Sequence, residues 1–236
     1  MKKQLLDYSL VSSGFLMMVV YHIWLLHRII KHPTKTVLGV NAINRLLWVR
    51  TMMDNMSKNG ILAVQTLRNN IMASTLLASM AIMLSSVIAV LMSNRNARPS
   101  KFVYGDESDL GFSIKLFSIL ICFLMAFLFN VQSIRYYSHA SILINVPVKN
   151  MSSSSSSHLT VEYVGRTVNR GSHFWSLGLR AFYFSFPLFF WIFGPIPMFL
   201  CCLVLVFMLY FLDVTFEFGQ AIGAVDEDKD EEQEVN

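Results

Sequence analysis

The stretch FYFSFPLFFWIFGPIPMFLCCLVLVFMLYFLD, residues 182–213, decides the fold because it fits neither one straight membrane helix nor two. Its 32 residues would make a helix of ~48 Å, whereas a bilayer core is ~30 Å thick. A hairpin of two spans would place Arg180 inside the membrane, at a cost of ~2.5–3.5 kcal/mol. The stretch therefore predicts one bent crossing at about residues 190–212. The residues expected to bend it are Pro187, Gly194, Pro195 and Pro197.

The composition is that of an integral membrane protein. Hydrophobic residues make up 54% of the chain and charged residues 14%, and the mean hydropathy is +0.51. Ordinary soluble domains contain ~25% charged residues. A soluble core of this size cannot absorb several runs that are each long enough to span a bilayer.

Three further apolar runs have that length, which is about 20 residues in a helix. They lie at about residues 9–26, 71–92 and 114–134. Strands of a membrane barrel would alternate apolar and polar side chains, whereas these runs are continuous. The first run is too long for the apolar region of a signal peptide, and no cleavage pattern follows it. The predicted fold class is an all-α membrane bundle with four transmembrane helices in residues 1–215.

The positive charges indicate an orientation for these four spans. Of the 19 Lys and Arg residues, twelve lie between the first and second or the third and fourth spans, and seven lie elsewhere. The positive-inside rule then makes both long segments cytosolic and puts both termini on the other side, in the plasma membrane or a secretory-pathway membrane. Asn55 and Asn150 fit the N-glycosylation pattern. Because both fall on the cytosolic side, we expect neither to be glycosylated.

The long segments have structure of their own. Residues 42–70 show apolar side chains at helical spacing and predict an amphipathic helix, weakened at residues 58–60, that continues into the second span. The third span likewise continues as a helix towards Pro147. These extensions are expected to project into the cytosol, where their apolar faces pack on each other or lie in the lipid interface. Their basic residues suit anionic lipid better than nucleic acid.

Two other segments are expected to lack packed structure. Residues 150–158 contain six consecutive serines and predict a flexible linker. Residues 216–236 form a tail whose acidic block, DEDKDEEQE, is of the disordered type.

Polar side chains inside the predicted spans are the candidates for a functional path, because such residues are expensive in lipid. Ser74, Ser79 and Ser85 lie among alanines in the second span, and Asn130 lies in the third. Small residues let helices approach closely, and a buried amide bonds across them. Packing therefore explains these four residues at least as well as a conduction path does.

Histidines suggest one cofactor hypothesis. His22 and His139 lie near the same end of the first and third spans, and paired imidazoles from membrane helices hold b-type haem. Haem binding is the most remote alternative, since the two residues differ in depth. The chain has no phosphate-binding glycine loop, no HExxH and no nucleophile elbow, and its three cysteines all fall in predicted spans. We therefore expect no enzyme, no metal site and no cofactor.

Several long motifs also occur in one order along the chain: WVRTMMDNMSKNGILAVQTLRNNIMASTLLAS, SHASILINVP, VEYVGRTVNRGSHFWSLGLRAFYF, PLFFWIFGPIPMF and LYFLD. In these the chain resembles the plant membrane proteins grouped as domain of unknown function 599, over roughly residues 8–213. The resemblance implies a multi-pass membrane protein from a plant, and it brings no activity and no functional residues. The serine run and the acidic tail look like additions to the family pattern.

Two functions of different classes follow from these patterns. The first is a membrane-anchored interaction or organising protein, whose long helices recruit protein partners or further copies of the chain. The second is an oligomeric ion channel or small-solute transporter component, with the serine face of the second span near its path. The first needs fewer assumptions, because four spans are few for a carrier that acts alone.

Overall fold

The computed structural model describes residues 2–93, 109–146 and 154–214. In this part the chain forms six α-helices and one short 3₁₀-helix, and the only strand-like pairing is a single bridge between Thr36 and Val214. The predicted all-α class is confirmed for these residues. The elements are α1 (Lys2–Lys31), η1 (Pro33–Lys35), α2 (Val37–Asp54), α3 (Met56–Ser93), α4 (Asp109–Leu143), α5 (Ser154–Trp191) and α6 (Pro195–Asp213).

Four helical segments are long and apolar enough to cross a membrane, as the sequence predicts: Ser9–Lys31, Met56–Ser93, Leu110–Leu143 and Pro195–Asp213. Large apolar side chains cover their outward faces; Val90 and Phe207, for example, are each 66% exposed. In water an apolar surface of this extent would drive association, whereas in a bilayer it is solvated by lipid. The fold is that of a multi-pass membrane protein.

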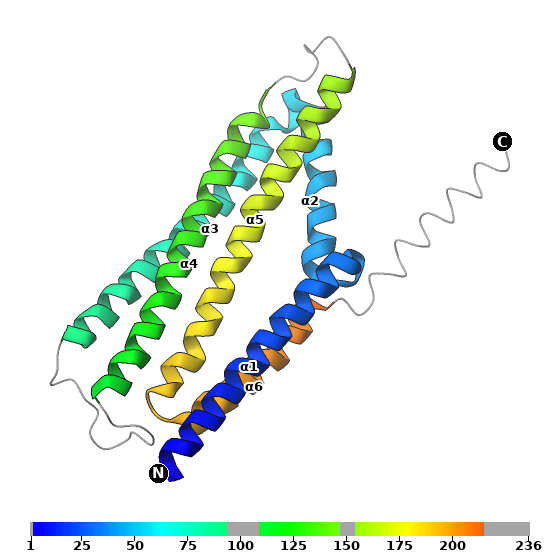
Figure 1. Cartoon of the computed structure of the whole chain (residues 1–236). Helices are drawn as coiled ribbons and strands as arrows, with labels where there is room; N and C mark the ends of the chain where they lie inside the picture. Colours follow the sequence, from blue (N-terminus) through cyan, green and yellow to red (C-terminus); the bar gives the residue numbers. More distant parts are fainter. Residues whose placement is uncertain (1, 94–108, 147–153, 215–236) are drawn as a thin grey trace.

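Helix α4 is the centre of the largest bundle and lies between α3 and α5 (Figure 1). Apart from Lys115, the buried residues of α4 and of the turn after it recur at alternating intervals of three and four, which is the heptad spacing of a coiled-coil seam. A spacing close to 3.5 residues per turn keeps these positions on one face of the helix. The seam residues are Leu116, Ile119, Phe123, Ala126, Asn130, Ser133, Tyr137, Ala140 and Ile144.

Glycines in α5 stand where α4 approaches most closely. A Cβ atom at Gly171 would lie 3.1 Å from the ring of Tyr137, and one at Gly178 would overlap the side-chain amide of Asn130. The two glycines are seven residues apart, as are their two partners, so the antiparallel helices keep one register over two turns. A larger side chain at either position would push the helices apart.

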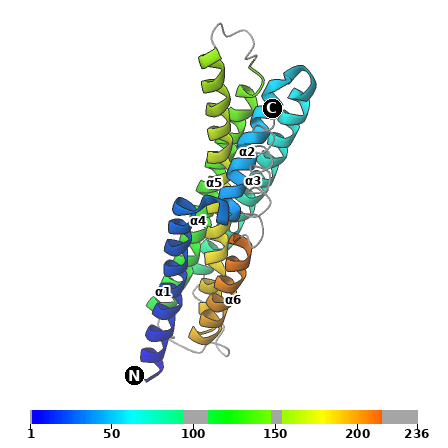
Figure 2. The same ribbon diagram turned by 90° about the vertical axis from the view of Figure 1, so that its right-hand side faces the viewer.

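Helices α1 and α6 form a second pair and run in the same direction (Figures 1 and 2). Early in both helices, Gly14 lies against Cys202, where a Cβ atom would be 3.1 Å from the cysteine sulfur. Further along both, Tyr21 and Leu25 pack with Leu209. The first residues of α1 and the last residues of α6 therefore lie at opposite ends of this pair.

Residues 182–213 contain a reversal and not the single bent crossing that their length suggests. Helix α5 ends at Trp191, Gly194 takes a φ of 150° that side chains disfavour, and Pro195 starts α6. Beyond this turn α6 packs back along α5, so that Tyr183 packs against the cluster that contains Leu209. The two helices meet at the Gly-Pro-Ile-Pro stretch where the sequence predicts a kink, and Pro187 stays inside α5. In place of one bent helix, the stretch therefore forms the turn of an α5–α6 hairpin, and its candidate span is Pro195–Asp213.

A tight elbow turns the chain from α1 into α2. The Thr36 hydroxyl caps α2 by accepting a hydrogen bond from the backbone N–H of Gly39 at 3.3 Å. A Cβ atom at Gly39 would overlap the carbonyl of Pro33, so only glycine permits this turn. The bridge from Thr36 to Val214 ties the elbow to the end of α6.

Two local predictions need correction. The helix predicted over residues 42–70 breaks at Asn55 and not at residues 58–60. Met53 and Leu67, on either side of this break, are buried in one core, and this burial offsets the low helix propensity of Gly60. The serine linker predicted over residues 150–158 is helical from Ser154, where α5 begins. The start of that linker, Asn150 and the acidic tail lie outside the described residues.

Candidate functional site

An ion pair joins α5 to the end of α6, on the side that faces α1. The Arg180 guanidinium donates from Nη2 to Asp213 Oδ1 at 2.7 Å, and the Tyr21 hydroxyl donates to Asp213 Oδ2 at 2.8 Å. The two charged side chains are only 14% and 10% exposed. Both carboxylate oxygens are therefore satisfied, and α1, α5 and α6 are held together at one point.

His22 completes this network and is held in one tautomer. Its Nδ1 lies 2.7 Å from the backbone carbonyl of Met18, which can only accept, so Nδ1 must hold the proton. Its Nε2 is then free to accept from Arg180 Nη1, 3.4 Å away. The imidazole is neutral in this arrangement and packs against the ring of Phe184, with ring centroids 4.9 Å apart.

Aromatic rings cover the network and suit a membrane interface. Trp24 stacks on Tyr210 with ring centroids 5.9 Å apart, and the Arg28 guanidinium lies 5.2 Å from the Trp24 ring centroid. Tyr and Trp concentrate at the border between hydrocarbon and water. The network therefore links three helices beneath these rings.

The sequence contains a signal for this pair, although reasoning from the length of residues 182–213 misses it. Asp213 is the only charged residue of α6 and follows a long apolar run. Arg180 stands alone in a similar run. Because an isolated charge in lipid is costly, two opposite charges in separate apolar runs are expected to pair with each other.

The two histidines proposed as a haem pair are not brought together. His22 contacts Arg180 and Phe184. His139 is exposed on α4 and faces Tyr163 of α5, with ring centroids 6.3 Å apart. Among the described residues, no group of three His, Cys, Asp or Glu side chains is placed to hold a metal ion.

The predicted polar path divides between helix seams and the outer surface. Ser133 donates to the carbonyl of Gly171 at 2.8 Å, so the Ser74 hydroxyl, 3.2 Å from Ser133, is the donor in their hydrogen bond. Ser85 is also buried, whereas Ser79 points outwards. The serines therefore do not share one face.

Asn130 lies within the α4 seam and is completely buried. Its amide nitrogen donates to the Ala126 carbonyl at 2.8 Å, whereas its side-chain oxygen has no partner among the described residues. Like Ser74 and Ser133, this residue therefore lies between packed helices.

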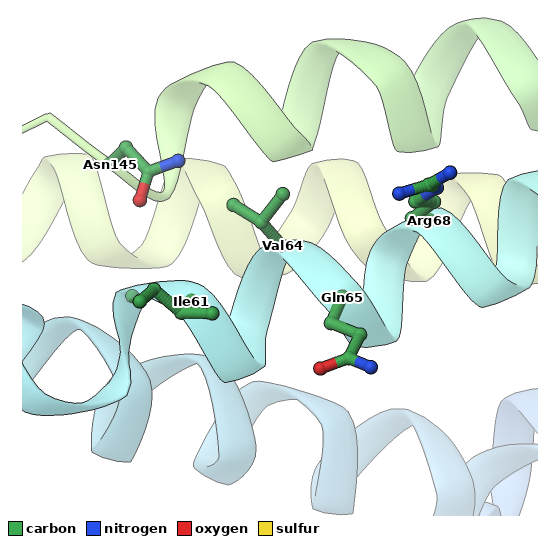
Figure 3. A pocket seen from close by; sticks show the side chains of 6 residues that line it. Ile61, Val64, Gln65, Arg68 and Asn145 are labelled. Carbon is green, nitrogen blue, oxygen red and sulfur yellow. The ribbon is translucent and has the colours of Figure 1, made fainter.

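A groove lies on the outer side of α3 near its start, away from the apolar run. Figure 3 shows Ile61, Val64, Gln65 and Arg68 on α3, with Asn145, just beyond the end of α4, across from Val64. The groove has a volume of about 430 Å³. Ile61 is 85% exposed, the largest exposure among the large apolar side chains of the described residues.

The long helices are apolar on their outer faces, and several of their polar side chains form hydrogen bonds between helices. These features are those of a multi-pass helical membrane protein. The chain belongs to the family described as "Protein of unknown function, DUF599", whose model matches residues 9–218. No curated protein and no solved structure matches the chain.

Proposed function

We propose that this is a membrane-anchored organising protein, in which the membrane helices hold a folded helical projection at the membrane surface. The observation behind this proposal is a hydrophobic core that lies beyond the apolar runs of α3 and α4 and joins them to α2 and α5. Its buried members are Val49, Met53, Ala63, Leu67, Tyr137, Ala140, Ile144, Val164 and Val168. A projection with its own core presents a rigid surface, as a recruiting protein requires. From the family resemblance we also infer a plant source.

The groove of Figure 3 is the proposed contact for a protein partner. Ile61 and Val64 offer apolar contact, and Arg68 supplies a positive charge at one end. These features suit an amphipathic helix with an apolar face and a carboxylate one or two turns along it. Burial of the exposed Ile61 side chain against a partner would be favourable, because it removes apolar surface from water.

The proposed topology has five crossings, because α5 supplies one that the apolar runs alone do not reveal. Residues 175–191 of α5 pack beside α4 and α6 and would span ~25 Å as a helix. The parallel course of α1 and α6 supports an odd number of crossings. We place the projection in the cytosol with the C-terminal end, and the N-terminal end on the other side. This topology also places Lys229 in the cytosol, which adds to the excess of Lys and Arg residues on that side.

Photocrosslinking in intact cells tests the recruiting role. A photoreactive residue placed at Ile61 is expected to give a discrete protein adduct, identified by mass spectrometry, and the Arg68→Glu exchange is expected to abolish it. The same probe at lipid-facing Val90 serves as the matched control and should react with lipid alone. Equal adducts at both positions, or none at Ile61, would contradict the proposal.

Liposome flux separates the organising role from the channel alternative. Purified protein, of measured oligomeric mass, is expected to pass no common cation or anion, because Ser74 and Ser85 lie in helix seams. A selective current that changes when Ser79, on the outer surface, becomes Phe would favour a path formed between copies of the chain instead.

A further inference from the structure

A second cavity, of about 230 Å³, lies where α2, α3, α4 and α5 meet. Its lining consists of Arg45, Asn70, Ala73, Tyr137, Ser172 and Trp175. One water occupies roughly 30 Å³ in the liquid, so the space holds a group of several heavy atoms. Five of the six lining residues have polar side chains, which is unusual for a gap between packed helices.

Arg45 enters this cavity with a donor that has no partner. Its Nε donates to Asn169 Oδ1 at 2.8 Å, and the Asn169 amide donates to the Ala42 carbonyl at 3.0 Å, which fixes the guanidinium in place. Its Nη2 is buried without a hydrogen-bond partner in the described residues. The Nε side of the guanidinium is thus held by Asn169, and the Nη2 side is available to donate to a ligand.

The charge of Arg45 is also uncompensated. In the part of the chain that the structure describes, the ion pairs are Arg166 with Glu162 and Arg180 with Asp213, and neither involves Arg45. Burial lowers the pKa of Arg45 from its ordinary value, as expected for a cation that has left water without a counter-ion. A partly buried cation whose Nη2 is shielded from water is costly unless an anion pairs with it.

Other donors point to the type of anion. The indole N–H of Trp175, which can only donate, is likewise buried without a partner in the described residues. Arg45 comes from α2, Trp175 from α5, and the amide of Asn70 from α3. Donors that converge from three helices suit a tetrahedral group with several oxygens better than a planar carboxylate with two.

The cavity lies beside the ends of two apolar runs, where a bilayer would place its lipid head groups. Asn70 immediately precedes the apolar run of α3, and Tyr137 follows that of α4 by three residues. A phosphate at this depth is available both from lipid and from the aqueous phase.

We propose that this cavity binds a phosphate group, held by the Arg45 guanidinium, the Trp175 indole N–H and the polar side chains around them. The group is carried by a lipid head group or by a soluble phosphate. This site is separate from the groove at Ile61, so either proposal can fail without the other.

Calorimetric titration of the purified full chain in detergent tests the site. The probes are inorganic phosphate, dioctanoyl phosphatidic acid and, as the phosphate-free control, dioctanoylglycerol. Arg45→Gln is expected to weaken binding of the phosphate probes by about tenfold or more, and Trp175→Phe by about threefold or more, since each removes a hydrogen bond to a charged group. Arg50→Gln, an exposed position on the same helix, should leave binding within about twofold of the wild type.

Each outcome has a definite meaning. Binding of phosphatidic acid alone identifies lipid as the source, and equal binding of inorganic phosphate identifies a soluble ligand. The proposal is overturned if neither phosphate probe binds, if dioctanoylglycerol binds as tightly, or if Arg45→Gln binds like the wild type. Should Arg45→Gln fail to fold, as judged by size-exclusion chromatography, unchanged affinity of Trp175→Phe overturns it instead.

Discussion

Replacing Asp213 by Asn should destabilise the protein far more than its single altered atom suggests. The exchange keeps the shape of the side chain but removes the charge opposite Arg180, whose side chain is only 14% exposed. The guanidinium is then left in an apolar site, with His22 and a neutral amide as its partners. The hydrogen bond from Tyr21 also loses its charged acceptor.

The magnitude follows from this geometry. Removing one partner of a buried ion pair typically costs ~3–5 kcal/mol. For a chain of this size each kcal/mol lowers Tm by roughly 2–4 °C, so the expected decrease is about 6–20 °C. Thermal unfolding of the purified protein in detergent, followed by circular dichroism, measures this decrease.

An exposed pair on the same helix supplies the control. Arg166 and Glu162 are 2.7 Å apart, but their side chains are 71% and 46% exposed, so Arg166→Gln should cost no more than ~0.5 kcal/mol. Adding Arg180→Gln to Asp213→Asn should restore part of the lost stability, because it removes the unpaired charge. If Asp213→Asn costs no more than Arg166→Gln, the argument for the ion pair is refuted.

Three further exchanges test the packing. Gly178→Ala should lower the free energy of unfolding by ~1–3 kcal/mol, because its Cβ would overlap Asn130; denaturant unfolding that leaves it unchanged would contradict the close α4–α5 contact. Gly194→Ala should cost ~1–3 kcal/mol through its φ of 150°, and a wild-type Tm in that variant would argue against the reversal. Ser74→Val should cost ~1 kcal/mol whereas Ser79→Val should be nearly neutral, and equal effects in the two melts would mean that the serines share one environment.

The membrane class and most helix positions follow from local composition, which is why the sequence predicts them. Continuous apolar runs of about 20 residues are typical of membrane helices. All four predicted spans lie within or overlap the long apolar helices. The break at Gly194 and Pro195 is also predicted from local sequence, since both residues act on their own backbone.

The hairpin, the packing of α5 and the cavity at Arg45 depend on residues far apart in the chain, so no local pattern predicts them. The cost of Arg180 argued against a hairpin because its partner, Asp213, lies 33 residues further on. Helix α5 is too polar to count as a span by composition, yet its glycines bring it against α4. The cavity at Arg45 likewise forms only when four helices meet, so no local sequence pattern predicts it.

The central claim is that α5 and α6 form a hairpin that places the two ends of the chain on opposite sides of the membrane. A protease-cleavable epitope tag fused to each end, with the fusion proteins assayed in sealed microsomal vesicles, tests it directly. The five-crossing topology predicts that protease added outside removes the C-terminal tag and leaves the N-terminal tag protected. Removal of both tags, or protection of both, would contradict it and restore the four-span arrangement.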